Sequence, residues 1–342
     1  MKKYDVTIGI PIYNSIVCIQ KSLMSALSQS YNTIEYLLVD DGSTDGTSSV
    51  INHLVQSHRR HDDIRIISHQ ANLGVSASRN QIIDKAQGEY LYFMDSDDVI
   101  AEDTIELMMQ NIRQYEAEIV FGSYEKIELS GRKTVYEYPY KQLLIEDELA
   151  CFAYRKYAGI QASACNFLVK VSVLRNNNHR FIDANYWEDM VFTFDLVTLI
   201  SRAVLLPNIT YSYICRENSL SHYQHREIIP KGEVMHNVKA IHHLKLTSSK
   251  LVDKAYFPNR CFIIVMTDFY IACNLIKRRQ DIRPFVNDRE IRSIMKHPAS
   301  FLQICKFHNT RIKNMGIYLL GIFPSFLCVG LITCMGKLKK LI

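Results

Sequence analysis

The chain has 342 residues, with 40 Lys and Arg against 35 Asp and Glu, and 48% of its residues are hydrophobic. At roughly 150 residues per domain, this length provides about two domains with a sizeable core. The 13 Gly and 8 Pro exclude collagen-like and broadly disordered chains, and the net charge of +5 does not by itself indicate a nucleic-acid partner. The nine cysteines contain no Cys-x-x-Cys pair, which favours reduced thiols in a cytosolic setting.

The charge is distributed unevenly along the chain. Residues 1–125 carry a net charge of −9, residues 126–270 carry +4 and residues 271–342 carry +10. The acidic front and the basic rear therefore need separate explanations. The N-terminus contains two lysines, but its apolar stretch is short and is interrupted by Asp5 and Pro11. We expect no signal peptide there and a chain that begins in the cytoplasm.

The first 125 residues alternate between short apolar runs, typical of buried strands, and amphipathic stretches, typical of helices. The expected strands are 6–10, 36–39, 64–67, 90–94 and 118–121, and the expected helices include 15–29, 75–86 and 102–115. This alternation predicts an α/β fold with a doubly wound, mainly parallel sheet flanked by helices. Residues 126–225 read as mixed structure, and residues 226–314 read as a helical extension with apolar residues at helical spacing.

Polar loops follow three of the expected strands. They are Tyr13-Asn14, Asp40–Asp45 and Asp95–Asp98. Ligands of doubly wound sheets bind beyond the carboxyl ends of the strands, where these loops would lie. Three carboxylates within residues 95–98 repel one another, and a divalent cation such as Mg²⁺ or Mn²⁺ would relieve that repulsion. The alternative for each loop is an ordinary turn in which a carboxylate caps the next helix.

Several motifs occur together in one order along the chain. They are Pro11-Ile12-Tyr13-Asn14, Val39–Asp45, Asn72–Asn80, Gly88 and Phe93–Asp98. The ordered set resembles the family 2 inverting glycosyltransferases of the GT-A fold, and in particular the bacterial glycosyltransferases of surface polysaccharides. The resemblance covers about the first 225 residues. It implies a GT-A-type sheet, a nucleotide-sugar donor and a divalent metal.

The resemblance also implies roles for individual residues. Asp41 would bind the nucleotide base, usually uracil, and Arg79 would lie near the diphosphate. Asp97 would be the main metal ligand, Asp95 would contact ribose or the metal, and the cofactor would be Mn²⁺ or Mg²⁺. The full set of expected donor-binding residues is Pro11, Tyr13, Asn14, Asp41, Arg79, Asp95, Ser96, Arg216, Ser219 and Ser221.

The second half of the expected site lies in the mixed segment. Asp189 matches the family's general base, which takes the proton of the acceptor hydroxyl, and Glu188 is its alternate or an orienting neighbour. The alternative is that both are simply first-turn acids favoured by the helix dipole. Trp187, the only tryptophan, is a candidate for stacking against an acceptor sugar, with a core position as the equal alternative. His222 is a candidate third metal ligand.

The rear of the chain contains an uncharged run of 21 residues, 316–336, followed by Lys337, Lys339 and Lys340. As one helix this run would measure roughly 31 Å, about the thickness of a bilayer's hydrocarbon core. Three interpretations remain: a spanning helix, an interfacial hairpin broken at Pro324, and a helix packed on the globular part. The preceding basic residues would be attracted to anionic lipid, so we expect association with the inner face of the cell membrane.

These observations predict four segments: a donor-binding half (1–125), an acceptor-binding half (126–225), a basic helical extension (226–314) and an apolar tail (315–342). The expected activity is transfer of a sugar from a nucleotide-diphosphate donor, most simply a UDP-sugar, to a glycan or lipid-linked glycan, without a nucleic-acid partner. One alternative is a sugar nucleotidyltransferase, although Pro11–Ser15 lacks the expected Gly- and Lys/Arg-rich phosphate loop. Another is an inactive membrane-associated nucleotide-sugar-binding protein, against which Asp95, Asp97 and Asp189 argue.

Overall fold

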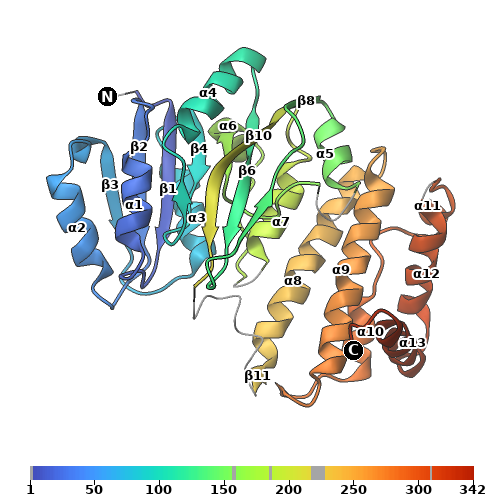
Figure 1. The fold of residues 1–342 in the computed structure, drawn as a ribbon. Coiled ribbons are helices and arrows are strands. Elements are labelled where there is room, and N and C mark those ends of the chain that lie inside the picture. Colours follow the sequence, from blue (N-terminus) through green and yellow to red (C-terminus); the bar gives the residue numbers. More distant parts are fainter. Residues whose placement is uncertain (1–2, 156–158, 185–186, 217–227, 309) are drawn as a thin grey trace. The chain divides into compact units, whose positions relative to one another are not determined.

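The computed structural model describes the whole chain except residues 1–2, 156–158, 185–186, 217–227 and 309. The chain forms two compact units (Figure 1). Unit 1 comprises Met1–Leu149, Ala162–Asp183 and Leu196–His222. Unit 2 comprises Ala150–Gln161, Ala184–Asp195 and Tyr223–Ile342.

Unit 1 is built on one sheet whose strands run in the order β3-β2-β1-β4-β9-β6-β10-β5, with β7 paired to β6 and β8 paired to β10. The pairs β3–β2, β2–β1, β1–β4 and β6–β10 are parallel, and β9 is antiparallel to both of its neighbours. The strands are β1 (Val6–Ile12), β2 (Ile34–Asp40), β3 (Ile64–Ser68), β4 (Tyr90–Phe93), β5 (Val99–Ile100), β6 (Ile119–Ile127), β7 (Lys133–Tyr136), β8 (Gln142–Ile145), β9 (Phe167–Lys170) and β10 (Arg202–Ile214).

Helices flank this sheet on both faces, as the alternating sequence pattern predicts (Figure 1). They are α1 (Ile19–Leu27), α2 (Thr47–Ser57), α3 (Val75–Lys85), α4 (Thr104–Tyr115) and α6 (Val171–Asn176), with a short 3-10 turn η1 (His61–Asp63). Helices α5 (Glu148–Ala153) and α7 (Glu188–Leu196) cross the division between the units. The doubly wound, mainly parallel sheet of the predicted fold class is therefore confirmed.

The first two strands are buried along their whole length, which explains their nearly continuous apolar sequences. Glu35 is a charged residue within β2, and its fully buried carboxylate accepts hydrogen bonds from Thr7 Oγ1 at 2.6 Å and the Gln87 N–H at 2.7 Å. The Glu35 carboxylate also forms an ion pair with Arg65. The Gly88 N–H donates to Thr7 Oγ1 at 2.9 Å, so the turn before β4 lies directly against β1.

Unit 2 contains the helical extension predicted for residues 226–314. Its elements are α8 (Lys231–Ser248), η3 (Ser249–Leu251), α9 (Phe257–Lys277), α10 (Asp288–Ile294), α11 (Phe301–Cys305), α12 (Arg311–Ile322), α13 (Ser325–Leu338) and the parallel strand pair β11 (Ile229–Pro230) and β12 (Ile282–Arg283). Asn287 and Ser300 start α10 and α11 with capping boxes, which satisfy N–H groups that have no partner inside a helix. Phe257, Cys261, Ala299, Ile304 and Phe307 form a buried apolar cluster.

The uncharged run 316–336 is divided between two helices rather than forming one. Helix α12 ends at Ile322 and α13 begins at Ser325, because Pro324 lacks an N–H and disfavours a helical conformation in the residue before it. The 14 residues of α13 measure roughly 21 Å, short of the ~30 Å hydrocarbon core. The single spanning helix is therefore wrong. The break at Pro324 is the one expected for a hairpin, and both helices also contact α9.

Within the described part of the chain, one helix has the length and apolarity needed to cross a membrane. It is α9, with 21 residues, and 67% of its apolar window is buried inside the structure. Packing in the core of unit 2 accounts for these apolar side chains. The buried ion pair between Lys245 of α8 and Asp268 of α9, with 2.6 Å between Nζ and Oδ2, also fixes α9 within this unit.

Replacing Gly88 by Ala is expected to lower the free energy of unfolding by about 1–3 kcal/mol. A Cβ at Gly88 would lie 2.4 Å from the backbone nitrogen of Thr7 and 2.5 Å from the carbonyl carbon of Val6, so β1 would have to move. Gly232 of α8 is the control, because a Cβ there meets nothing within 4 Å. Chemical denaturation followed by circular dichroism measures both variants. Equal midpoints for Gly88→Ala and the wild type would contradict this expectation.

Candidate functional site

Three loops meet at one edge of the sheet because they follow the adjacent parallel strands β2, β1 and β4. Hydrogen bonds join them directly. Asn14 Oδ1 accepts from the Thr44 N–H at 2.8 Å, and the Asn14 N–H donates to Ser43 Oγ at 3.0 Å. On the other side, the hydroxyl oxygens of Ser15 and Ser96 are 2.8 Å apart. The structure thus brings together the three polar loops that the sequence placed at separate strand ends.

In the loop after β2, the carboxylate of Asp41 is 2% exposed and has three polar contacts. Oδ1 accepts from the Leu73 N–H at 2.9 Å, and Oδ2 accepts from the Gly74 N–H at 2.8 Å. His69 Nδ1 lies 2.6 Å from Oδ1. The residue expected to bind the nucleotide base therefore also holds the turn that leads into α3. The Asn72–Asn80 motif and the Asp40–Asp45 motif are physically coupled through this carboxylate.

Two other expected donor-binding residues differ in exposure. Tyr13 is 45% exposed, whereas Pro11 is buried within β1, opposite Val39 of β2. Gly42 adopts a φ of +75°, and a Cβ there would lie 2.8 Å from the carbonyl carbon of Ala71. This close backbone approach explains why the loop requires glycine.

In the loop after β4, two carboxylates each face an arginine. Arg79 Nη2 lies 2.9 Å from Asp95 Oδ1, and Arg216 Nε lies 2.6 Å from Asp97 Oδ2. The side chains of Asp95 and Asp97 are 31% and 20% exposed, respectively. Burial and the neighbouring Asp95 charge raise the pKa of Asp97, and Arg216 opposes that rise. The arginines expected at the diphosphate thus contact the acids expected at the metal.

Arg79 is held in place by more than its ion pair. The residue is 5% exposed, and its guanidinium carbon lies 5.3 Å from the centre of the Phe181 ring. Asn80 fixes the backbone of Phe181 on both sides, since its Nδ2 donates to the Phe181 carbonyl at 2.9 Å and its Oδ1 accepts from the Phe181 N–H at 2.8 Å. Phe181 also packs edge-on against Phe93 of β4. The Arg79 guanidinium is therefore pre-organised beside Asp95.

The third acid of this loop, Asp98, is 1% exposed and ties the loop to β10. Its carboxylate accepts from the Tyr211 hydroxyl at 2.6 Å and from the Ile214 N–H at 2.8 Å. The Tyr211 hydroxyl in turn accepts from the Asp95 N–H at 3.3 Å. Burial, together with the charges of Asp95 and Asp97, raises the pKa of Asp98 to about 8. Asp98 thus anchors the loop to β10, while Asp95 and Asp97 of the same loop are more exposed.

Sequence reasoning missed four residues of this region: Ser15, Cys18, His69 and Tyr211. His69 follows β3 directly, so the strand-end rule that selected the other three loops would have found it. Ser15 was assigned to a helix that in fact begins at Ile19. Cys18 Sγ lies 3.7 Å from Arg216 Nη1, and Tyr211 lies inside β10. Neither has a local sequence signal, because each reaches the site only through the tertiary fold.

The expected general base belongs to unit 2. Helix α7 begins at Glu188, which is 8% exposed, and continues with the half-buried Asp189, whose Oδ1 accepts from the Met190 N–H at 2.6 Å. Acids in a first helical turn are favoured by the helix dipole. Trp187, half-buried, precedes them with a φ of +66°, a conformation that is costly for a bulky side chain.

Three expected site residues, Ser219, Ser221 and His222, lie outside the described residues. Among the residues that the structure describes, no group of three or more His, Cys, Asp or Glu side chains forms a metal site. The expected metal ligands Asp95 and Asp97 place two carboxylates, whose hard oxygens suit Mg²⁺ or Mn²⁺, on one loop.

Residues 7–177 match the family model described as "Glycosyl transferase family 2". An uncharacterized glycosyltransferase of Haemophilus influenzae is 35% identical over 128 residues, which cover 37% of this chain and 50% of that protein. Glycosyltransferase GlyG of Streptococcus pneumoniae serotype 4 is 26% identical over 224 residues, covering 63% of this chain and 72% of that protein. Cholesterol galactosyltransferase of Borreliella burgdorferi is 25% identical over 228 residues, covering 64% and 62%. The chain thus spans only about half of the first relative's length.

Two solved structures share the fold across nearly the whole chain. S. aureus TarS 1-349 in complex with UDP-GlcNAc has a TM-score of 0.56 at 17% identity, covering 93% of this chain and 90% of that one. Mannosyltransferase PcManGT from Pyrobaculum calidifontis, in complex with GDP-Man and Mn²⁺, has a TM-score of 0.50 at 14% identity, covering 98% and 88%. At these identities the likeness establishes the fold.

The substitution Asp41→Asn is expected to lower the free energy of unfolding by about 1–3 kcal/mol, even without a ligand. An amide has one acceptor oxygen, so it cannot accept from both the Leu73 and Gly74 N–H groups through two oxygens as the carboxylate does. Asp62, whose side chain is 84% exposed, provides the control Asp62→Asn. Denaturation without nucleotide compares the two. A similar stability in both variants would show that Asp41 has no structural role.

Proposed function

Because this chain belongs to glycosyl transferase family 2 and has the GT-A fold, we propose that this glycosyltransferase moves a sugar from a nucleotide-diphosphate donor to a hydroxyl of a glycan or lipid-linked glycan. The donor that we propose is a UDP-sugar. It is supported by TarS, a neighbour in fold whose structure contains UDP-GlcNAc. The relative named cholesterol galactosyltransferase, whose name denotes a lipid acceptor, is compatible with an acceptor that contains a lipid.

The observation that carries this proposal is that two carboxylates of the loop after β4 each pair with a guanidinium group, one from α3 and one from the segment after β10. In the pairs Arg79–Asp95 and Arg216–Asp97, each carboxylate faces one guanidinium group. A diphosphate brings negative charge that bare carboxylates would repel. A divalent cation on the acids and the planar guanidinium groups on the phosphate oxygens would together neutralise it.

The residues present fit a divalent metal. Asp95 and Asp97 supply hard carboxylate oxygens, and both are accessible enough to reach a cation. Mg²⁺ and Mn²⁺ in phosphate-transfer sites commonly use one or two carboxylates and take their other ligands from water and the substrate's phosphates. When bound, the metal would stabilise negative charge on the departing diphosphate. PcManGT, a neighbour in fold whose structure contains Mn²⁺, supports this assignment.

The proposed reaction is a single displacement with inversion at the anomeric carbon. The acceptor oxygen forms a bond to that carbon as the bond to the diphosphate oxygen breaks, and the bonding electron pair leaves with the diphosphate. Asp189 takes the proton of the acceptor hydroxyl, with Glu188 as its neighbour or alternate. The remaining expected roles are also proposals: Pro11, Tyr13 and Asp41 for the nucleotide base, Asn14 and Ser96 for the donor, Ser219 and Ser221 for the diphosphate, His222 for the metal, and Trp187 for the acceptor.

The variants Asp97→Asn and Asp189→Asn are expected to separate binding from chemistry. Wild type should bind UDP measurably only with Mn²⁺, and Asp97→Asn should lose that binding. Asp189→Asn should bind UDP with Mn²⁺ as wild type does, but should release UDP from a UDP-sugar about 10²–10⁴-fold more slowly. Calorimetry measures binding, and a coupled assay across UDP-glucose, UDP-galactose and UDP-GlcNAc measures turnover.

The control for these variants is Asp103→Asn, at the start of α4 and outside the proposed site. It should bind and turn over like the wild type. Metal-independent UDP binding by Asp97→Asn would contradict the metal assignment, and unchanged turnover by Asp189→Asn would contradict the assigned base.

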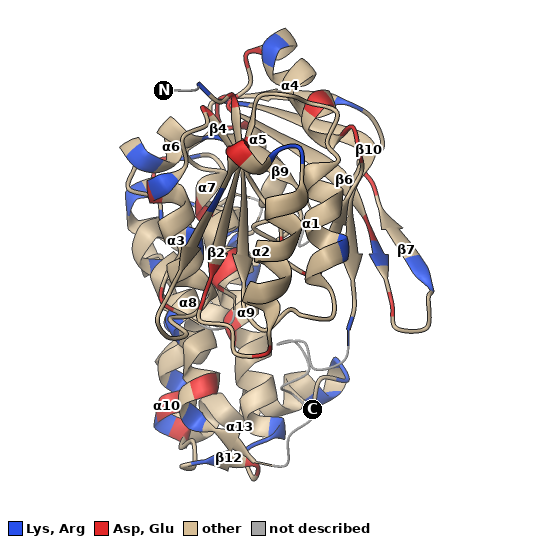
Figure 2. Ribbon diagram, turned by 90° about the vertical axis from the view of Figure 1, so that its left-hand side faces the viewer, with Lys and Arg blue, Asp and Glu red and all other residues tan. Residues whose placement is uncertain are grey.

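We also propose that unit 2 associates with the cytoplasmic face of an anionic membrane through helices α11–α13. After Glu290 the chain contains eight Lys and Arg and no Asp or Glu, and basic segments are visible near the C-terminus in Figure 2. The same helices expose large apolar side chains, namely Phe301, Leu302, Ile312, Leu319, Ile322, Phe326 and Leu338. A surface that combines cations with apolar side chains fits anionic headgroups above acyl chains.

A variant with Lys337, Lys339 and Lys340 changed to Gln is expected to bind anionic vesicles on the order of 10²-fold more weakly, at about 1 kcal/mol for each lysine. Cosedimentation with phosphatidylglycerol–phosphatidylcholine vesicles measures this, and pure phosphatidylcholine vesicles are the reference. Lys141→Gln, an exposed lysine of unit 1, is the control. Equal binding to both kinds of vesicle would contradict an electrostatic membrane surface.

A further inference from the structure

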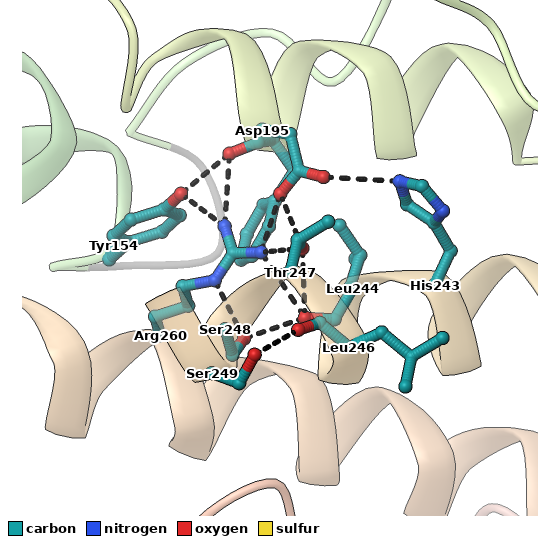
Figure 3. Close-up of polar contacts among 10 residues, drawn as sticks. Tyr154, Asp195, His243, Leu244, Leu246, Thr247, Ser248, Ser249 and Arg260 are labelled. Carbon is teal, nitrogen blue, oxygen red and sulfur yellow. Dashed lines mark hydrogen bonds and ion pairs between the residues drawn. The ribbon is translucent and has the colours of Figure 1, made fainter. Parts of the chain in front are cut away.

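Arg260 of α9 is the largest fully buried side chain in the described chain, with 0% exposure. Its guanidinium group lies among side chains and carbonyls of three other segments (Figure 3). It donates to Ser248 Oγ at 2.9 Å, the Tyr154 hydroxyl at 2.6 Å, Thr247 Oγ1 at 2.8 Å, the carbonyls of Phe194 and Leu244 at 3.3 Å each, and a carboxylate oxygen of Asp195. A guanidinium has five N–H groups, and these contacts occupy all of them.

Two of these contacts hold the end of α7. Asp195 and the Phe194 carbonyl belong to its last turn, and the Tyr154 hydroxyl also donates to that carbonyl at 2.5 Å. The Arg260 guanidinium carbon further lies 5.1 Å from the centre of the Phe194 ring. Isolated helices of nine residues are marginal in water, so the position of α7 depends on such tertiary contacts.

The surroundings of Asp195 favour the ionised form of its carboxyl group. Burial alone would raise its pKa, but the hydrogen bond from His243 and the charge of Arg260 lower it below its ordinary value. His243 Nε2 lies 3.4 Å from the second carboxylate oxygen, and Thr247 Oγ1 donates to the first at 3.1 Å. Arg260 and Asp195 are therefore both charged at neutral pH. Their hydrogen-bonded ion pair fixes the orientation of the two side chains.

Helix α7 begins with Glu188 and Asp189, and Asp195 follows Asp189 by six residues, roughly 9 Å along the axis. We propose that Arg260 is a positioning residue for the Asp189 carboxylate, so that the helical extension forms part of the catalytic apparatus. This inference rests on the proposed function, in which Asp189 is the base. Arg260 lies outside residues 7–177, the part that matches the family model. It therefore adds a requirement beyond the sheet unit.

Arg260 holds α7 in position through the planar, forked shape of its guanidinium group. One planar group contacts α7, the residue after α5 and the end of α8, and thereby fixes the direction and rotation of α7. A lysine ammonium would keep the charge but could not reach this set of acceptors. A displacement of about 1 Å at a reacting group costs up to roughly 10²-fold in rate. The structure thus predicts that charge alone does not replace Arg260.

The test uses the full-length variants Arg260→Lys, Arg260→Met and Asp195→Asn, assayed at a temperature at which each is folded by circular dichroism. The rate constant for UDP release from the UDP-sugar that wild type hydrolyses with Mn²⁺ should fall roughly 10–100-fold. The Kd for UDP with Mn²⁺ should stay within about twofold, because no expected donor or metal ligand contacts this group. Combining Arg260→Lys with Asp195→Asn should add little to the worse single variant. Arg289→Met, an exposed arginine of the same unit, is the control.

A wild-type rate constant in Arg260→Lys, beside an impaired Asp189→Asn, would overturn this inference and leave the proposed function intact. Parallel losses of UDP binding and rate in the Arg260 variants would also overturn it, because they would indicate general structural damage. An unchanged rate in Asp189→Asn would overturn the assigned base and this inference together.

Discussion

The convergence of carboxylates at one sheet edge is the constraint on which the first unit depends. The strands β2 and β4 lead into the loops that carry Asp41 and the acids Asp95, Asp97 and Asp98, and the loop after β1, between them, hydrogen-bonds to both. Each carboxylate needs compensation, and the fold provides it in three ways. Backbone N–H groups serve Asp41, guanidinium groups serve Asp95 and Asp97, and a tyrosine hydroxyl with a further N–H serves Asp98. The acids also differ in exposure, since Asp41 and Asp98 are buried whereas Asp95 and Asp97 are partly exposed.

In the second unit the buried charge that needs compensation is positive, and it belongs to the guanidinium group of Arg260. Arg260 brings its charge into a core where an unsatisfied guanidinium would be strongly unfavourable. Its acceptors come from segments far apart in sequence, so satisfying the charge also fixes helices α7, α8 and α9 together within this unit. A buried charge of this kind specifies one arrangement of helices more strictly than apolar contacts alone, because only one geometry satisfies all its donors.

Sequence reasoning succeeded where the signal was local. The alternation of strands and helices, and the polar loops at the ends of β1, β2 and β4, follow from patterns within short windows, and the structure has them at nearly the expected boundaries. It left alternatives open where the answer depended on packing. The run 316–336 looked more like a membrane segment than α9 did, yet Pro324 divides that run and α9 is the longer apolar helix. Hydropathy cannot distinguish a core helix from a spanning one.

The fold class and the family could be predicted from the sequence, because ordered motifs at strand ends encode the sheet topology. The sequence also selected Asp41, Arg79, Asp95, Asp97 and Arg216 as a set. The partners of these groups became known only from the folded structure. It placed Asp41 in a structural hydrogen-bond network, paired each remaining acid with one arginine, and recruited His69, Tyr211 and Arg260. The reason is physical: the partner of a buried charge is chosen by distance in space, which local sequence patterns do not record.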